Sequence, residues 1–294
     1  EKDLEKRKRF GDRWDGKRIR GLDGIHSIMP YLFKNRVASE VYSKEAFDMT
    51  EVLEQMKGIK EEDPESGITA FHYIVTAFAK TIYHRPDLNR FIAGKRFYQR
   101  NFITFSFIVK RYMGDEAKEM IMILKIDETM NLLDISKKIT GEVTDLREAG
   151  KDDVDLLLQA LRKLPRFLMT FVMFIFRTLD FYGKMPRSVC HGDINYQSLL
   201  LSNLGSINAD ACYHHLNDYG TNSMVCTIGR IHKEKVLDPE GKESIRDVAN
   251  FGITIDERIA DGFYFARSTR LLKHLLLNPD ILLSPIKEAI DYEY

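Results

Sequence analysis

The segment Asp256-Glu257-Arg258-Ile259-Ala260-Asp261-Gly262 lies near the C-terminus, between two runs of residues with different hydrophobic patterns. Residues 248–255 before it are rich in apolar and β-branched side chains, which is typical of a buried strand. Residues 263–277 after it have the pattern of a helix that ends at Asn278-Pro279. A charged turn between a strand and a helix holds its side chains on two rigid supports. The pattern therefore predicts a functional site at this turn.

The rest of the chain mixes strand and helix patterns without strict alternation. Thr69 precedes residues 70–84, in which apolar side chains recur at helical spacing. Residues 101–111 and 119–126 are rich in Ile, Phe, Val and Met, and predict an antiparallel hairpin. Further strands are predicted at residues 37–49, 197–202 and 223–231, and further helices at residues 22–35, 51–57, 127–139 and 151–182. This order predicts an α+β fold with a mixed sheet flanked by helices.

The composition excludes several classes of protein. The 294 residues carry 44 basic and 44 acidic side chains, so no global attraction to nucleic acid is expected. The three cysteines cannot all pair with one another, and the N-terminus is charged rather than apolar, so we expect a cytoplasmic protein. Residues 1–20 hold nine basic and five acidic residues, which predicts an exposed charged arm before a domain at residues 21–294.

Residues 154–183 form the most apolar region, and residues 167–176 are the longest apolar run. A helix that crosses a membrane needs about 20 apolar residues, so this run is too short to do so. It could be a buried helix, lie in a membrane interface or line an acyl-chain pocket. We therefore expect an inserted apolar helical region at about residues 150–186, with a peripheral membrane or protein contact through residues 165–183 as an alternative to burial.

No metal site is predicted. His214 and His215 lie close in sequence to Cys212, and Cys190 adjoins His191. The spacings typical of zinc ligands, Cys-x-x-Cys and His-x(3–5)-His, are absent from this group. The simplest interpretation of the paired histidines is a polar loop before a strand.

Four more short motifs join residues 256–262, and all five lie in one order over roughly residues 20–285. They are His84-Arg-Pro-Asp-Leu-Asn89, Leu199-Leu-Leu-Ser-Asn-Leu-Gly205, Ile228-Gly-Arg-Ile231 and Asn278-Pro-Asp-Ile-Leu-Leu283. This series resembles the catalytic domain of the 2-oxo acid dehydrogenase (dihydrolipoamide) acyltransferases, which are part of the chloramphenicol acetyltransferase-like superfamily. Residues 256–262 resemble the family's Asp-His-Arg-x-x-Asp-Gly motif, except that Glu257 stands where the family has its catalytic histidine.

The resemblance implies a chloramphenicol acetyltransferase-like fold and a homotrimer with active sites at the subunit interfaces. It implies coenzyme A or acyl-CoA as a substrate and a thiol, hydroxyl or amine as the acyl acceptor. By position, Glu257 is the general base, Ser202 donates a hydrogen bond to the oxyanion, and Asp261 is a structural aspartate in an ion pair. The candidate substrate-binding residues are Asn203, His214, His215 and Arg258. We expect no counterpart of the family's lipoyl-lysine domain in this chain.

The glutamate weakens the expected chemistry. A thiol has a pKa of about 8.5, a histidine about 6.5 and a glutamate about 4.3, so the replacement adds roughly 3 kcal/mol to proton transfer. Burial can raise the pKa of a glutamate and so reduce this added free-energy cost. A protonated glutamate is also neutral, and so stabilises an oxyanion less than a histidine cation does. Three functions stay open: transfer with Glu257 as base, transfer with another base, and a catalytically inactive acyl-CoA-binding or scaffold trimer.

Overall fold

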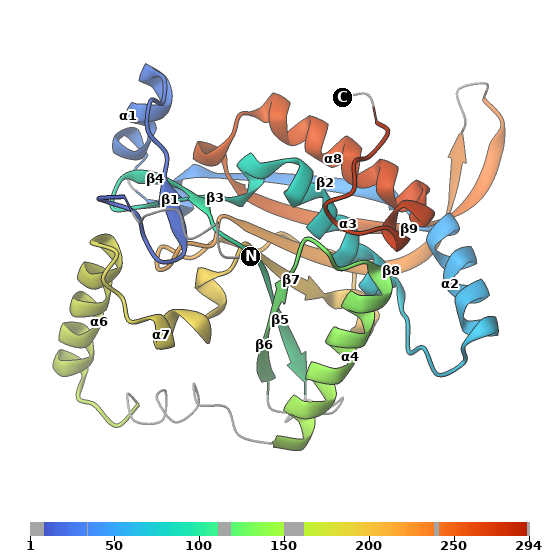
Figure 1. The fold of residues 1–294 in the computed structure, drawn as a ribbon, viewed down its shortest axis with the longest axis horizontal. Helices are drawn as coiled ribbons and strands as arrows, with labels where there is room; N and C mark the ends of the chain where they lie inside the picture. Colours follow the sequence, from blue (N-terminus) through green and yellow to red (C-terminus); the bar gives the residue numbers. More distant parts are fainter. Residues whose placement is uncertain (1–8, 34, 111–118, 150–161, 238–240, 293–294) are drawn as a thin grey trace.

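A six-stranded mixed sheet with helices on one face forms the centre of the computed structural model (Figure 1). The structure describes residues 9–33, 35–110, 119–149, 162–237 and 241–292. Its strands are β1 (Gly16–Arg18), β2 (Glu40–Asp48), β3 (Arg90–Ala93), β4 (Arg96–Arg100), β5 (Ile103–Lys110), β6 (Glu119–Ile126), β7 (Leu199–Asn203), β8 (Met224–Leu237) and β9 (Glu243–Asp256). Its helices are α1 (Gly24–Leu32), α2 (Thr50–Glu62), α3 (Ala70–His84), α4 (Leu132–Ala149), α6 (Arg166–Phe181), α7 (Arg187–His191) and α8 (Gly262–Leu277).

The strand order of the large sheet is β2-β9-β8-β7-β5-β6. β7 runs parallel to β5 and β8, and the other neighbours are antiparallel. Phe251 of β9 packs against Phe78 of α3 and Phe47 of β2, with ring centroids 6.3 and 4.2 Å away. Because side chains alternate along a strand, Gly252 points to the opposite face. The main apolar core therefore lies on the face of Phe251, and a loop segment packs against the face of Gly252.

Most of the predicted elements are present. α3 spans the predicted residues 70–84, and β5 and β6 pair as the predicted antiparallel hairpin. β2, β7, β8 and β9 occupy the predicted strand positions. The second part of the helix predicted at residues 151–182 is α6, and its beginning, residues 151–161, lies outside the described residues. The predicted α+β fold, a mixed sheet flanked by helices with an inserted apolar helix, is confirmed.

A second sheet, with strand order β1-β4-β3, was not expected. Its first strand lies within the N-terminal residues for which we expected an exposed charged arm. Arg13 and Asp15 are both buried and form an ion pair, with 2.8 Å between Nε and Oδ1. The charge of this segment is therefore partly paired inside the protein, and β1 packs against β4. Residues 1–8 lie outside the described residues, and the boundary at residue 20 stays a prediction.

The buried His72 in the first turn of α3 makes stability depend on pH. Its Nδ1 accepts a hydrogen bond from the Thr69 backbone N–H at 3.1 Å and lies 3.0 Å from the Ser136 hydroxyl. Burial lowers the pKa of His72 from 6.5 to about 4, and the charge of Lys60 acts in the same direction. In the unfolded chain the His72 imidazole is therefore protonated below pH 6.5, whereas in the folded protein it is protonated only below pH about 4.

We expect the free energy of unfolding to fall by about 3 kcal/mol through this group as the pH falls from 6.5 to 4. Urea unfolding at several pH values measures this, with His72→Gln as the comparison. Between pH 6.5 and 4, the free energy of unfolding of the variant should fall less than that of the native protein. The carboxylates of both proteins contribute equally to the remaining fall. Equal slopes in the two proteins would show that His72 does not titrate in this way.

Candidate active site

The turn at residues 256–262 joins β9 to α8, as the sequence predicts. The Asp256 carboxylate is fully buried and accepts two hydrogen bonds from the Arg258 guanidinium, 2.8 Å from Nε and 2.7 Å from Nη2. Arg36 Nε lies 3.9 Å from the same carboxylate. A bidentate pair between arginine and a carboxylate fixes orientation as well as charge. The residues on both sides of Glu257 are therefore held in place.

Glu257 begins the short 3-10 helix η5 (Glu257–Ile259) and is half-buried. Within the part of the chain that the structure describes, no hydrogen bond or ion pair engages its carboxylate. Asp261 is exposed and caps α8, since its Oδ1 accepts a hydrogen bond from the Tyr264 backbone N–H at 2.7 Å. The ion pair that the resemblance implies for Asp261 is formed in this structure by Asp256. Asp261 instead stabilises the first turn of α8.

Ser202 lies on β7, on the same face of the sheet as Asp256. It pairs with Thr227 of β8, which in turn pairs with Gly252 of β9, four residues before Asp256. With about 4.8 Å between strands and about 3.4 Å per residue, Ser202 and Asp256 are roughly 17 Å apart. A single copy of the chain therefore does not bring the Ser202 hydroxyl and the Glu257 carboxylate together.

Residues 209–216 lie across β8 and β9 on the sheet face opposite the helices. Gly229 and Gly252 allow the backbone of this segment to approach the two strands closely. A Cβ added at Gly229 would lie 2.6 Å from the Ala211 nitrogen, and one added at Gly252 would clash with the Cys212 carbonyl oxygen. Any larger side chain at these two positions would push the segment off the sheet.

We expect Gly252→Ala to lower the free energy of unfolding by roughly 1–3 kcal/mol, because the new methyl group overpacks against the backbone at Cys212. Chemical denaturation measures the change. Gly141→Ala is the matched control, because this helical position in α4 has open space around an added Cβ and should gain about 0.5–1 kcal/mol. Equal effects of the two substitutions would contradict the packing of residues 209–216 on the sheet.

His214 and His215 lie at the end of this segment, beside β2. Their exposed rings stack with centroids 4.8 Å apart. The next residue, Leu216, donates its backbone N–H to the Glu40 carboxylate, and Glu40 is opposite Asp256 in the pairing of β2 with β9. The two histidines are therefore closer along the sheet to the 256–262 turn than to the end of β7, where Asn203 follows Ser202.

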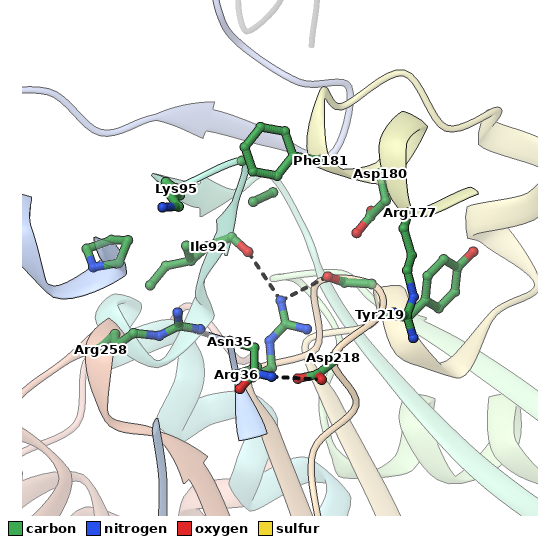
Figure 2. A pocket seen from close by; sticks show the side chains of 14 residues that line it. Asn35, Arg36, Ile92, Lys95, Arg177, Asp180, Phe181, Asp218, Tyr219 and Arg258 are labelled. Carbon is green, nitrogen blue, oxygen red and sulfur yellow. Dashed lines mark hydrogen bonds between the residues drawn. The ribbon is translucent and has the colours of Figure 1, made fainter. Parts of the chain in front are cut away.

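A cavity of about 310 Å³ lies beside Arg258 (Figure 2). Arg177 and Asp180 form the wall opposite Lys95 and Arg258, with Arg36 between them (Figure 2). Four cationic side chains and two carboxylates line the cavity, which leaves a formal charge of +2; these residues are Arg36, Lys95, Arg177, Arg258, Asp180 and Asp218. The lining therefore favours an anionic group over a cationic one.

Arg36 at the base of this cavity is a buried structural cation. Its Nη1 donates to the Asn217 carbonyl at 2.8 Å, and its Nη2 donates to the carbonyls of Gly220 at 2.9 Å and Ile92 at 3.2 Å. Burial lowers the pKa of Arg36, and the nearby Asp256 opposes this shift. Its Nε makes no hydrogen bond. Arg36 thus links the cavity to the Asp256–Arg258 pair.

Comparison with known proteins agrees with the resemblance seen in the motifs. Residues 188–284 match the family model described as 2-oxoacid dehydrogenases acyltransferase (catalytic domain). This stretch holds four of the five motifs, including residues 256–262. Among curated proteins there is no match to this sequence.

Solved structures share the fold over most of the chain. A dihydrolipoamide acetyltransferase from Azotobacter vinelandii is 16% identical with a TM-score of 0.60, and the alignment covers 90% of this chain and 94% of the acetyltransferase chain. A catalytic core of the 2-oxoacid dehydrogenase multienzyme complex from Thermoplasma acidophilum is 14% identical with a TM-score of 0.55, covering 90% and 100%. A chloramphenicol acetyltransferase is 12% identical with a TM-score of 0.51, covering 89% and 99%. The resemblance and the predicted fold are confirmed.

The sequence located the turn but not the cavity beside it. Of the predicted site residues, only Arg258 lines the cavity. The others are divided between the end of β7, the segment 209–216 and the start of α8. Arg36, Lys95 and Arg177 were missed, because they lie in three separate segments with no motif around them. Within the described residues, no group of three or more His, Cys, Asp or Glu side chains is placed to hold a metal ion.

Proposed function

We propose that this protein is a CoA-dependent acyltransferase that works as a homotrimer, with each active site shared between two copies. Glu257 of one copy is the general base, and Ser202 of the neighbouring copy donates a hydrogen bond to the oxyanion. Coenzyme A carries the acyl group as a thioester, and a thiol, hydroxyl or amine accepts it. Asn203, His214, His215 and Arg258 contribute to the walls that bind the two substrates.

The reaction is an exchange of one acyl bond for another. The Glu257 carboxylate takes a proton from the acceptor, and the acceptor atom attacks the thioester carbonyl. The tetrahedral oxyanion accepts a hydrogen bond from the Ser202 hydroxyl, which lowers the energy of this intermediate. The carbon–sulfur bond then breaks, and the departing CoA sulfur regains a proton from Glu257.

The distance between Ser202 and the 256–262 turn is the observation that carries the shared site. The two lie on one face of one sheet, yet roughly 17 Å apart, too far for one substrate atom to meet both in a single copy. Most oligomers of identical chains have closed symmetry, in which each copy presents the same residues to its neighbour. The relative from Thermoplasma acidophilum, a catalytic core of a multienzyme complex, supports an assembled form.

The position of Glu257 also supports a role for it. In the Azotobacter vinelandii relative, a serine, a histidine and an asparagine were investigated for their catalytic role, with the asparagine four positions after the histidine. Glu257 and Asp261 have this spacing here, and both are accessible. A neighbouring copy that covers Glu257 would bury its carboxylate and make it a stronger base.

Titration of the protein with acetyl-CoA in a calorimeter, followed by a thiol-release assay with a small thiol acceptor, tests this proposal. We expect binding in the micromolar to millimolar range typical of enzyme substrates, and acceptor-dependent release of free CoA. Binding without release would favour the second function below. The absence of any binding would refute both.

The second function is that of a catalytically inactive acyl-CoA-binding or scaffold trimer. The glutamate itself favours it, since proton transfer to an ordinary glutamate is roughly 3 kcal/mol less favourable than to an ordinary histidine. A third arrangement uses His214 or His215 as the base, because both lie beside the Asp256 end of the sheet. Glu257→Gln, His214→Gln and His215→Gln separate these cases by which substitution abolishes release.

We also propose a cytoplasmic location for this protein. Cys190, Cys212 and Cys226 are all free thiols, of which two are buried. Free thiols persist in reducing compartments. Rapid lysis into denaturant that contains a thiol reagent should label all three cysteines, and a disulfide in the native protein would argue against this location.

A further inference from the structure

α6 is attached to the protein along one side only. None of its 16 residues is buried. Phe176 and Leu179 on its inner side pack against the small cluster of Met185, Cys190 and Tyr196. Figure 1 shows the helix at the periphery, away from the six-stranded sheet. Most of its surface therefore faces outwards.

The outer side of α6 is aromatic. Phe167, Phe171 and Phe174 are 77%, 58% and 65% exposed, and their spacing of four and three residues places them on one side of the helix. Phe181 and Tyr182 extend this surface at the C-terminal end, with 47% and 69% exposure. Exposed aromatic side chains that adjoin one another usually mark a binding surface.

The segment that carries these aromatic side chains is positively charged. Residues 162–187 contain six basic residues and one acidic residue, a net charge of +5 in a chain whose formal net charge is zero. All six basic residues are exposed; they are Arg162, Lys163, Arg166, Arg177, Lys184 and Arg187. The one acid, Asp180, points inwards, where the Tyr196 hydroxyl donates to it at 2.7 Å. Little negative charge on this surface offsets the six cations.

We propose that α6 binds the surface of a bilayer that contains anionic lipid, with its phenylalanines at the boundary of the acyl chains and its basic residues at the phosphates. A helix of this kind, with an apolar side and a cationic rim, is typical of interfacial membrane binding. Among the described residues, no helix is long and apolar enough to cross a membrane. α6 therefore lies on the bilayer, along its plane.

A second copy of the same helix is a poorer occupant of this surface. Two such helices would bring together like charges from both rims, which opposes association. A bilayer that contains anionic lipid attracts each exposed Lys or Arg, which a second cationic helix does not. Each basic residue near such a surface strengthens binding about fivefold.

Sedimentation with vesicles tests this proposal, using phosphatidylcholine alone and phosphatidylcholine with one quarter phosphatidylglycerol. We expect the native protein to sediment with the anionic vesicles at low salt, to bind neutral vesicles at least tenfold less well, and to be released at high salt. Failure to bind anionic vesicles at low salt would overturn the proposal. Equal binding to both kinds of vesicle would overturn the role of the basic rim.

Two variants locate the contact on α6. Substitution of all three exposed phenylalanines, Phe167→Ser, Phe171→Ser and Phe174→Ser, should reduce binding at least tenfold without unfolding the protein. The control is Leu237→Ser with Ile245→Ser, two apolar residues that are each 65% exposed. They belong to the paired ends of β8 and β9, which lie on the opposite side of the molecule from α6 (Figure 1). The control should bind as the native protein does. Unchanged binding by the triple variant would place the lipid contact elsewhere and refute the proposal.

Discussion

Asp256→Asn is expected to lower the free energy of unfolding by about 3–5 kcal/mol, because it leaves Arg258 without its buried counter-ion. The native carboxylate accepts hydrogen bonds from the Arg258 guanidinium at 2.8 and 2.7 Å and from the Ser39 hydroxyl at 3.0 Å. The second buried cation, Arg36, has its Nε 3.9 Å away and would lose the same partner. Denaturant unfolding measures the loss, provided that the dependence on denaturant concentration stays unchanged.

The matched control is Asp210→Asn. Asp210 also pairs with an arginine, Arg230, at 2.9 Å, but the two side chains are 70% and 46% exposed. Solvent screens such a pair, so the control should cost less than about 1 kcal/mol. If both substitutions cost the same small amount, the Asp256–Arg258 pair does not hold the turn as the structure indicates.

Glu257→His is expected to raise the rate of acyl transfer by up to about a hundredfold over the native protein, and Glu257→Gln to lower it by a factor of about 10²–10⁴. Histidine accepts the proton more readily by roughly 3 kcal/mol, and glutamine cannot accept it. Within the described residues, no contact of the Glu257 carboxylate would be broken by either change. The measured quantity is kcat/KM for release of CoA from acetyl-CoA.

Glu54→Gln on α2 is the control for the loss of one acidic charge. Glu54 is exposed and lies away from the turn, so its replacement should leave the rate unchanged. A native protein without transfer whose Glu257→His variant is active would be a silenced acyltransferase. If the native protein transfers acyl groups and Glu257→Gln does so equally fast, Glu257 is not the base. His214 and His215 would then be the candidates to test.

The large sheet and its helices were predictable because their signals are local. α3 has apolar residues at helical spacing after Thr69, and β5 and β6 are both rich in Ile, Phe, Val and Met. The small sheet was not predictable, because β1 has three residues and β3 has four. Strands of that length have too few residues to show alternation, and their pairing is decided by the tertiary fold.

The site was only partly predictable, for a related reason. The motif at residues 256–262 identified the correct turn, but the sequence could not say which of its two aspartates is buried. Asp256 ends a central strand and so faces into the protein, whereas Asp261 precedes a helix and so becomes its cap. The cavity and the segment 209–216 depend on contacts between distant parts of the chain, such as those of Gly252 with Cys212, which no local pattern records.

The measurement that tests the shared active site most directly is complementation between two inactive variants. Ser202→Ala and Glu257→Gln are each expected to reduce transfer at least a hundredfold. Subunits mixed at equal amounts in a trimer should regain about one quarter of the native rate, because one interface in four then combines an intact Ser202 with an intact Glu257. A mixture no more active than the separate variants would contradict a site shared between copies.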